Sequence, residues 1–147
     1  AQDRLQVIEF NPRMAAQFSD LYQRVLGLNV HEMAFALAHG QDPAGVHRST
    51  PQGGAAASLV YRSFDPHAHI RLPTATQVRA AQEAFPDSLI FSFPKDKAQI
   101  ARDFKWLRSY RYGIVHLHGR DEAHLQSRSE ALSQLLGWPA PFLDRTL

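Results

Sequence analysis

Residues 88–118, SLIFSFPKDKAQIARDFKWLRSYRYGIVHLH, carry the clearest pattern in this chain. An apolar run at 89–91 begins the stretch, and a second apolar run at 112–117 ends it. Between the two runs, Ile100, Phe104 and Leu107 recur at spacings of four and three residues, which places them on one face of an α-helix. The pattern therefore predicts a strand, a helix over about residues 95–109, and a second strand.

A helix with a single apolar stripe between two short apolar strands is typical of a crossover that packs on a parallel sheet. Such crossovers are almost always right-handed, so we expect both strands to have their carboxyl ends at the same edge. The rest of the chain continues the alternation of strand and helix patterns. We therefore expect a single α/β domain over residues 1–147, with helices packed on a mostly parallel sheet of about four to five strands.

The residues before this unit predict a short strand at 5–10 and then an αα-hairpin. Asn11-Pro12 is a favourable start for the first helix, and Gly27 is a favourable stop. Asn29, with Glu32 three residues later, resembles the capping box of a second helix. Residues 40–55 then hold four glycines and two prolines, which predicts a flexible loop.

The remaining elements follow from turn and cap residues. Two strands are expected at 57–64 and 67–72, on either side of Asp65-Pro66. Thr74 is expected to cap a helix that Pro86 breaks. A last helix is expected over about 121–136, and Trp138 and Phe142 of the tail are expected to pack on the body of the domain.

Composition limits the classes of function. The chain has 147 residues, of which 44% are hydrophobic, enough for one domain with one core. A formal net charge of +2 permits an anionic partner without requiring one. The chain contains no cysteine, which excludes disulfides, thiolate metal sites and a cysteine nucleophile. It contains no apolar run long enough to cross a membrane. We expect a cytoplasmic protein, with a secreted mature chain as the alternative because residue 1 is alanine.

Two pairs of histidines are separated by one residue each: His67 with His69, and His116 with His118. Residues two apart in a strand face the same side, so each pair would present two imidazoles together, and imidazole is a good ligand for Zn, Cu, Fe and Ni. A divalent metal held there would support a metal-dependent phosphoesterase or nuclease. In a parallel sheet, however, the two pairs would lie about 15 Å apart, at opposite strand ends, which disfavours one shared ion.

The run DPHAHI at 65–70 also resembles the paired-histidine motif of mobilisation relaxases over those six residues. The resemblance implies a divalent ion and a tyrosine nucleophile that nicks a DNA strand. Tyr22 and Tyr61 are the candidates for that nucleophile in this chain.

Basic side chains support a different function. Lys95, Lys97 and Arg120 lie at expected strand-to-helix junctions, where a parallel sheet would gather them with helix N-termini into a rim that attracts anions. Further basic residues alternate with Trp106 and two tyrosines, a combination in which cations meet phosphates and rings stack on bases. The predicted anion-binding and nucleic-acid-binding residues are Lys95, Lys97, Arg102, Lys105, Arg108, Arg111 and Arg120.

We therefore interpret the sequence as a small binding or accessory module that contacts an anionic partner, either nucleic acid or an acidic protein surface. The alternative is the metal-dependent phosphoesterase or nuclease that uses the histidine pairs. A third interpretation is an interaction domain that belongs to a larger assembly. The sequence leaves open whether the chain is an enzyme and which substrate or ligand it takes.

Overall fold

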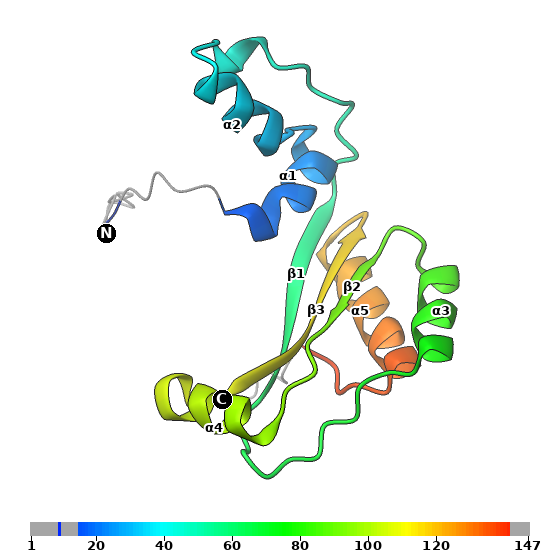
Figure 1. Ribbon diagram of the computed structural model, residues 1–147. Helices are drawn as coiled ribbons and strands as arrows, with labels where there is room; N and C mark the ends of the chain where they lie inside the picture. Colours follow the sequence, from blue (N-terminus) through cyan, green and yellow to red (C-terminus); the bar gives the residue numbers. More distant parts are fainter. Residues whose placement is uncertain (1–8, 10–14, 142–147) are drawn as a thin grey trace, which may run out of the picture.

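The computed structural model of the chain describes residue 9 and residues 15–141 (Figure 1). The elements in order are η1 (Ala16–Phe18), α1 (Ser19–Leu26), α2 (Val30–Ala38), η2 (Pro43–Gly45), β1 (Ala55–Ser63), α3 (Ala75–Ala84), β2 (Leu89–Ser92), α4 (Lys97–Leu107), β3 (Tyr110–Gly119) and α5 (Glu122–Leu136). The strand expected at 5–10 (apart from Glu9), the helix start at Asn11 and the packing of Phe142 fall outside the described residues. None of the described helices has the length and apolar composition needed to cross a membrane.

The sheet has three strands in the order β1-β3-β2, and both pairings are antiparallel. The β1–β3 ladder runs from Ala55 opposite Gly119 to Ser63 opposite Tyr110, while β2 is shorter and begins with Leu89 opposite His116. The mostly parallel sheet of four to five strands was therefore a wrong prediction. The strand expected at 67–72 is also wrong, because that segment has no regular structure.

The position of α4 explains why β2 and β3 are antiparallel. A parallel crossover has to carry the chain back along the sheet, whereas α4 lies at one end of it, just past the last residue of β2 (Figure 1). Arg108 ends the helix in the left-handed conformation, with φ of 55°, and the chain enters β3 two residues later. The apolar side of α4 packs at the start of β3, where the ring centroids of Phe104 and Tyr110 are 5.8 Å apart. A helix with one apolar stripe between two strands is thus compatible with either a parallel or an antiparallel arrangement of those strands.

One face of the sheet is covered by α5, with α3 beside it, and this is the main core (Figure 1). Leu125, Leu132 and Leu136 of α5 are buried against the strands. Trp138 closes the lower part of this core, as expected for the tail, with its ring centroid 4.7 Å from that of Tyr61. A Cβ atom at Gly113 would lie only 2.4 Å from the Trp138 ring, so only glycine fits at this point of β3.

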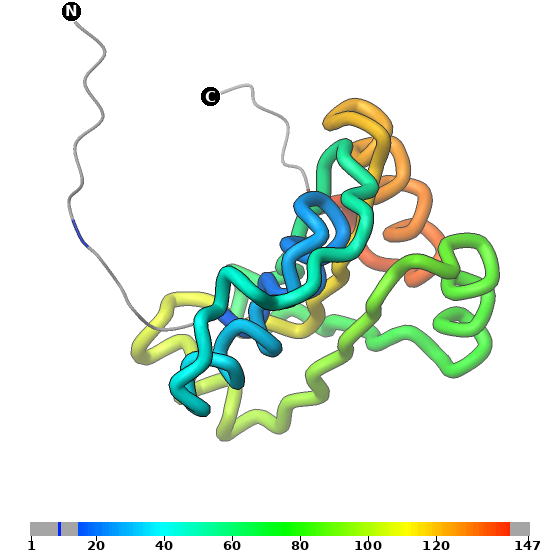
Figure 2. Tube along the Cα trace, turned by 90° about the horizontal axis from the view of Figure 1, so that it is seen from above, coloured from blue at the N-terminus to red at the C-terminus, as the bar shows by residue number. Residues whose placement is uncertain are grey.

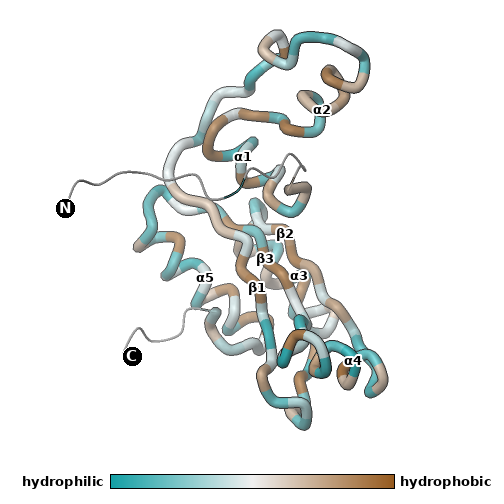
Figure 3. The backbone as a smooth tube through the Cα atoms, turned by 90° about the vertical axis from the view of Figure 1, so that its left-hand side faces the viewer, coloured by the Kyte–Doolittle hydropathy of each residue, from teal (hydrophilic) through white to brown (hydrophobic). Residues whose placement is uncertain are grey.

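The opposite face of the sheet carries α1, and α2 extends beyond the sheet (Figure 1). Seen from above, the α1–α2 arm lies on one side of the sheet and α3 with α5 on the other (Figure 2). The α1–α2 arm includes several hydrophobic stretches (Figure 3), and Phe35 and Leu37 of α2 are largely exposed. The loop after α2 returns along α1, where the amide of Gln52 donates to the carbonyl of Arg24 over 2.8 Å.

Helix ends follow the local signals of the sequence. Gly27 ends α1 with φ of 69°, and the Asn29 side chain accepts hydrogen bonds from two amides at the start of α2. Thr74 and Asp96 each form a capping box, with Gln77 and Gln99 respectively. These ends are decided within a few residues, and the predicted stop at Gly27 and caps at Asn29 and Thr74 are confirmed. The capping box expected at Asn29 is only partly formed, because Glu32 accepts from the Asn29 side chain and not from its backbone amide.

Candidate functional site

The basic residues expected to share one rim lie at opposite ends of the sheet. Lys95 and Lys97 are next to the start of α4, whereas Arg120 follows β3 at its far end. A strand of the length of β3 spans roughly 30 Å at about 3.4 Å per residue. Arg120 is also close to a carboxylate, because its Nε atom lies 3.3 Å from Asp121 Oδ2. The single rim that parallel strands would have produced is therefore not formed.

The outer side of α4 brings together exposed cations and an exposed indole. Arg102, Lys105 and Arg108 are all exposed, and Trp106 among them is 73% exposed. The Lys105 ammonium lies 5.2 Å from the centroid of the Trp106 ring, within the range of a cation–π contact. Leu107 adds a further apolar side chain that is 60% exposed. This helix therefore presents charge and apolar surface together to solvent.

Two neighbouring segments enlarge this surface. Arg62, near the end of β1, donates from Nη1 to Ser109 Oγ over 2.8 Å, which places its guanidinium beside the end of α4. Phe64 follows the last residue of β1 and is 73% exposed. The Arg111 guanidinium lies 4.6 Å from the centroid of the Phe93 ring. The α4 end is defined here as Arg62, Phe64, Arg102, Lys105, Trp106, Arg108 and Arg111.

The carboxylates of this region are already engaged. Asp96 accepts from the Gln99 amide over 2.8 Å as the cap of α4. Asp103 pairs with Lys95 Nζ at 2.9 Å, and the hydrogen bond from Lys95 lowers the pKa of the Asp103 carboxyl below its ordinary value. Both carboxylates are therefore tied to partners on their own segment.

The α4 end therefore has a local excess of positive charge. Arg62 and residues 93–111 together hold seven basic side chains and two acidic ones, whereas the whole chain has a net charge of only +2. Arg102, Lys105 and Arg108 have no carboxylate within ion-pair distance among the described residues. Charge is therefore unevenly distributed, with a positive pole at this end of the sheet.

The two histidine pairs do not meet. His67 and His69 lie in the irregular segment after β1, which is held near the start of β3 because the Tyr110 hydroxyl donates to the carbonyl of Ala68. His116 is six residues further along β3, which corresponds to about 20 Å. Among residues 9 and 15–141, no group of three or more His, Asp or Glu side chains is arranged to hold a metal ion. A site shared by all four histidines is therefore excluded by distance.

Each histidine of the second pair has its own structural setting. His116 is 6% exposed beneath α1, and neither ring nitrogen has a hydrogen-bond partner in the described part of the chain. Its Nδ1 atom lies 3.7 Å from Asp20 Oδ2, and burial lowers its pKa from the ordinary value. His118 Nε2 is 2.8 Å from the carbonyl oxygen of Gly53, so this ring fastens the loop before β1 to β3.

The tyrosines that the relaxase-like motif would need are not placed beside it as nucleophiles. Tyr61 is in the core, and its hydroxyl is hydrogen-bonded to Ser133 of α5 over 2.8 Å. Tyr22 is on α1, where it lines a hollow with Ala55 and Ala56 at the opposite end of β1. The six-residue resemblance therefore acquires no further support from the fold.

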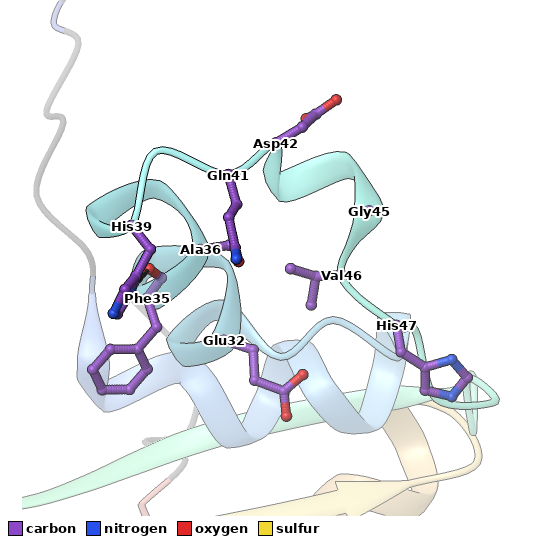
Figure 4. Close-up of a pocket in the computed structure, with 9 residues that line it drawn as sticks. All are labelled: Glu32, Phe35, Ala36, His39, Gln41, Asp42, Gly45, Val46 and His47. Carbon is purple, nitrogen blue, oxygen red and sulfur yellow. Dashed lines mark hydrogen bonds between the residues drawn. The ribbon is translucent and has the colours of Figure 1, made fainter.

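A hollow of about 480 Å³ lies between α2 and residues 41–47 (Figure 4). Its polar side chains point in different directions: the Asp42 carboxylate points outward, and His39 and His47 lie on opposite sides (Figure 4). His39 Nδ1 is occupied by a hydrogen bond with the carbonyl of Phe35, over 2.8 Å. Because its polar groups do not converge, this hollow is a weaker candidate for a binding site than the α4 end.

The chain was compared with protein-family models, with curated proteins and with solved structures, and none of them matches. The function therefore has to be argued from the residues of this chain. Of the α4 end, Arg102, Lys105, Arg108 and Arg111 were predicted from the sequence, whereas Arg62 and Phe64 were missed. Arg62 is in β1 and Phe64 directly follows it, both distant from α4 in sequence, and only the antiparallel β1–β3 pairing places them beside α4.

Proposed function

We propose that this chain is a binding module for single-stranded nucleic acid, and that the α4 end contacts the strand. The observation that carries the proposal is the indole of Trp106, 73% exposed and surrounded by cations that have no carboxylate partner in the described chain. Phe64 and Leu107 are also exposed at this end of the sheet, and exposed apolar side chains that gather in one region indicate an interaction surface. The positive pole specifies that the partner is anionic.

The combination of groups favours an unpaired strand over other anionic partners. Lysine and arginine neutralise phosphates, which releases counterions and makes affinity depend on salt. Exposed aromatic rings stack on bases that have no partner strand, a contact worth about 1–3 kcal/mol per base. Trp106 and Phe64 offer two such rings at one end of the sheet. An acidic protein surface would use the cations but would leave the planar rings without bases to stack on.

The test is a titration of a fluorescent oligothymidylate at several salt concentrations. The variant Arg102→Glu/Lys105→Glu/Arg108→Glu should lose measurable binding and keep its melting temperature, because all three side chains are exposed. The matched control is Arg48→Glu/Arg79→Glu/Arg120→Glu, which changes the net charge equally at exposed sites elsewhere. Trp106→Ala should lower affinity by about 1–3 kcal/mol with little effect on the salt dependence.

Two outcomes would reject this function. Equal losses in the two triple variants would mean that only net charge matters, and the α4 end would not be the site. Absence of binding by the unmodified chain at low salt would exclude nucleic acid altogether and leave an acidic protein partner.

A further inference from the structure

A cavity of about 270 Å³ opens beside the α4 end, between the irregular segment 68–72 and the residues that join β2 to α4. Its wall combines the rings of Phe93, Tyr110 and Tyr112 and the aliphatic side chains of Leu72 and Ile100 with the more polar His69. Lys95 also lines it and is held at 2.9 Å from Asp103. The cavity is thus continuous with the segment that carries the positive pole.

Tyr112 is the polar group that distinguishes this cavity. The residue is 2% exposed, and its ring is packed near Tyr61, Tyr110 and Trp138. The hydroxyls of Tyr61 and Tyr110 are bonded to Ser133 and to the Ala68 carbonyl, whereas the hydroxyl of Tyr112 has no partner among the described residues. A hydroxyl of the cavity lining that makes no bond among the described residues can donate to a bound molecule that offers an acceptor, and this hydrogen bond adds affinity.

The Tyr112 hydroxyl is also kept in its neutral form. Burial, together with the neighbouring Tyr61 and Tyr110, raises the pKa of Tyr112 to about 12. At neutral pH the group therefore carries its proton and can donate to a carbonyl oxygen or a ring nitrogen. Carbonyl oxygens and ring nitrogens are the acceptors found at the edges of nucleobases.

We infer that this cavity receives one unstacked nucleobase of the strand bound at the α4 end, with the Tyr112 hydroxyl bonded to the edge of the base. The inference depends on the proposed function and names a specific subsite within it. A volume of about 270 Å³ is just below the range of about 300–1,000 Å³ that holds drug-sized ligands, so a single ring system is the appropriate size. Aromatic walls suit the faces of a base, and the nearby cations suit the flanking phosphates.

The experiment compares an oligothymidylate with an abasic strand of the same length, because the abasic strand keeps the phosphates and lacks the bases. Leu72→Trp fills the cavity and should weaken the binding of the oligothymidylate about tenfold, while the affinity for the abasic strand stays the same. Leu89→Trp is the matched control, because Leu89 of β2 is exposed and does not line the cavity. It should change the affinity for neither the oligothymidylate nor the abasic strand. Tyr112→Phe, which removes only the hydroxyl, should weaken the base-bearing strand about five- to tenfold and leave the abasic strand unchanged.

Each failure has its own meaning. If the unmodified chain binds the oligothymidylate, and both Leu72→Trp and Tyr112→Phe bind it as tightly, the subsite is wrong and the proposed function stands. If the unmodified chain binds neither strand, the proposed function itself fails. Should Leu72→Trp not fold, Tyr112→Phe still decides the question, together with photo-crosslinking of a 5-iodouracil strand. The crosslink should map to Phe93, Tyr110 or Tyr112, and a crosslink found only at Trp106 would overturn the subsite.

Discussion

The helices on either side of β3 in the sequence, α4 and α5, are opposite in character. Three leucines of α5 are buried in the core, and even its serines at 129 and 133 are buried and hydrogen-bonded. In contrast, α4 has no buried residue and exposes both Trp106 and Leu107. The same chain therefore buries apolar side chains efficiently on one helix and leaves them in water on the next.

This difference separates stability from recognition. Burial of apolar area on α5 is the main favourable contribution to folding, at roughly 25 cal/mol per Å² removed from water. The exposed side chains of α4 contribute little of this kind, so their energetic value lies in a contact that the isolated chain does not make. Substitutions on α5 should consequently alter unfolding, and substitutions on α4 should alter binding.

The largest expected effect is on the stability of the core. Leu132 is 0% exposed, and Leu132→Ala should lower the free energy of unfolding by about 2–5 kcal/mol, through lost burial and the cavity that remains. The same substitution at the exposed Leu107 should change it by about 0.5 kcal/mol or less. Urea unfolding followed by circular dichroism measures both. Similar losses at the two sites would break the distinction between the helices.

An intermediate effect is expected from the ion pair that joins α5 to the turn before β2. Both terminal nitrogens of Arg128 bond to the Asp87 carboxylate, at 2.5 and 3.1 Å, and Arg128 also donates to the carbonyl of His118. Asp87→Asn should cost about 1.5–3 kcal/mol, the usual value for hydrogen bonds to charged groups. Burial acts to raise the pKa of Asp87, but the hydrogen bond and charge of Arg128 outweigh it and lower the pKa below 3.8.

The direction of the pH dependence follows from that lowered pKa. In the unfolded chain the Asp87 carboxyl takes up a proton near its ordinary pKa of 3.8, whereas in the folded chain it does so only at lower pH. The stability that the ion pair contributes is therefore present above pH 3.8 and is lost as the pH falls through the folded pKa. Unfolding midpoints measured from pH 5 down to pH 2 should fall less steeply in Asp87→Asn than in the unmodified chain. Parallel curves would show that the pair contributes no acid-sensitive stability.

The smallest expected effect concerns His116, on the face of the sheet that α1 covers. Burial lowers its pKa most strongly; Asp20 opposes this, and Arg24 adds to the lowering. The unfolded chain therefore binds a proton more readily than the folded chain as the pH falls below 6.5, and stability decreases in that range. His116→Leu should flatten the dependence between pH 7 and pH 5, as measured by thermal unfolding. A His67→Leu control should leave it unchanged, since that side chain is exposed.

Much of the α4 end could be predicted from the sequence, because a helix face is a local property. Arg102, Lys105 and Trp106 lie on the outer side of α4 because their spacing opposes that of Ile100 and Phe104. The contributions of Arg62 and Phe64 required the pairing of β1 with β3, which no local pattern specifies. The proposed base cavity depends on three separate segments, so the sequence offered no signal for it.

The sequence alone determined where most elements begin and end, since caps such as Asn29 and Thr74 and stops such as Gly27 act through hydrogen bonds within one turn. Only the tertiary structure decided the direction of the strands. Side-chain alternation specifies which residues share a face, but the same alternation satisfies a parallel and an antiparallel neighbour. The choice was made by the position of α4, whose apolar side packs at the end of the sheet and reverses the chain.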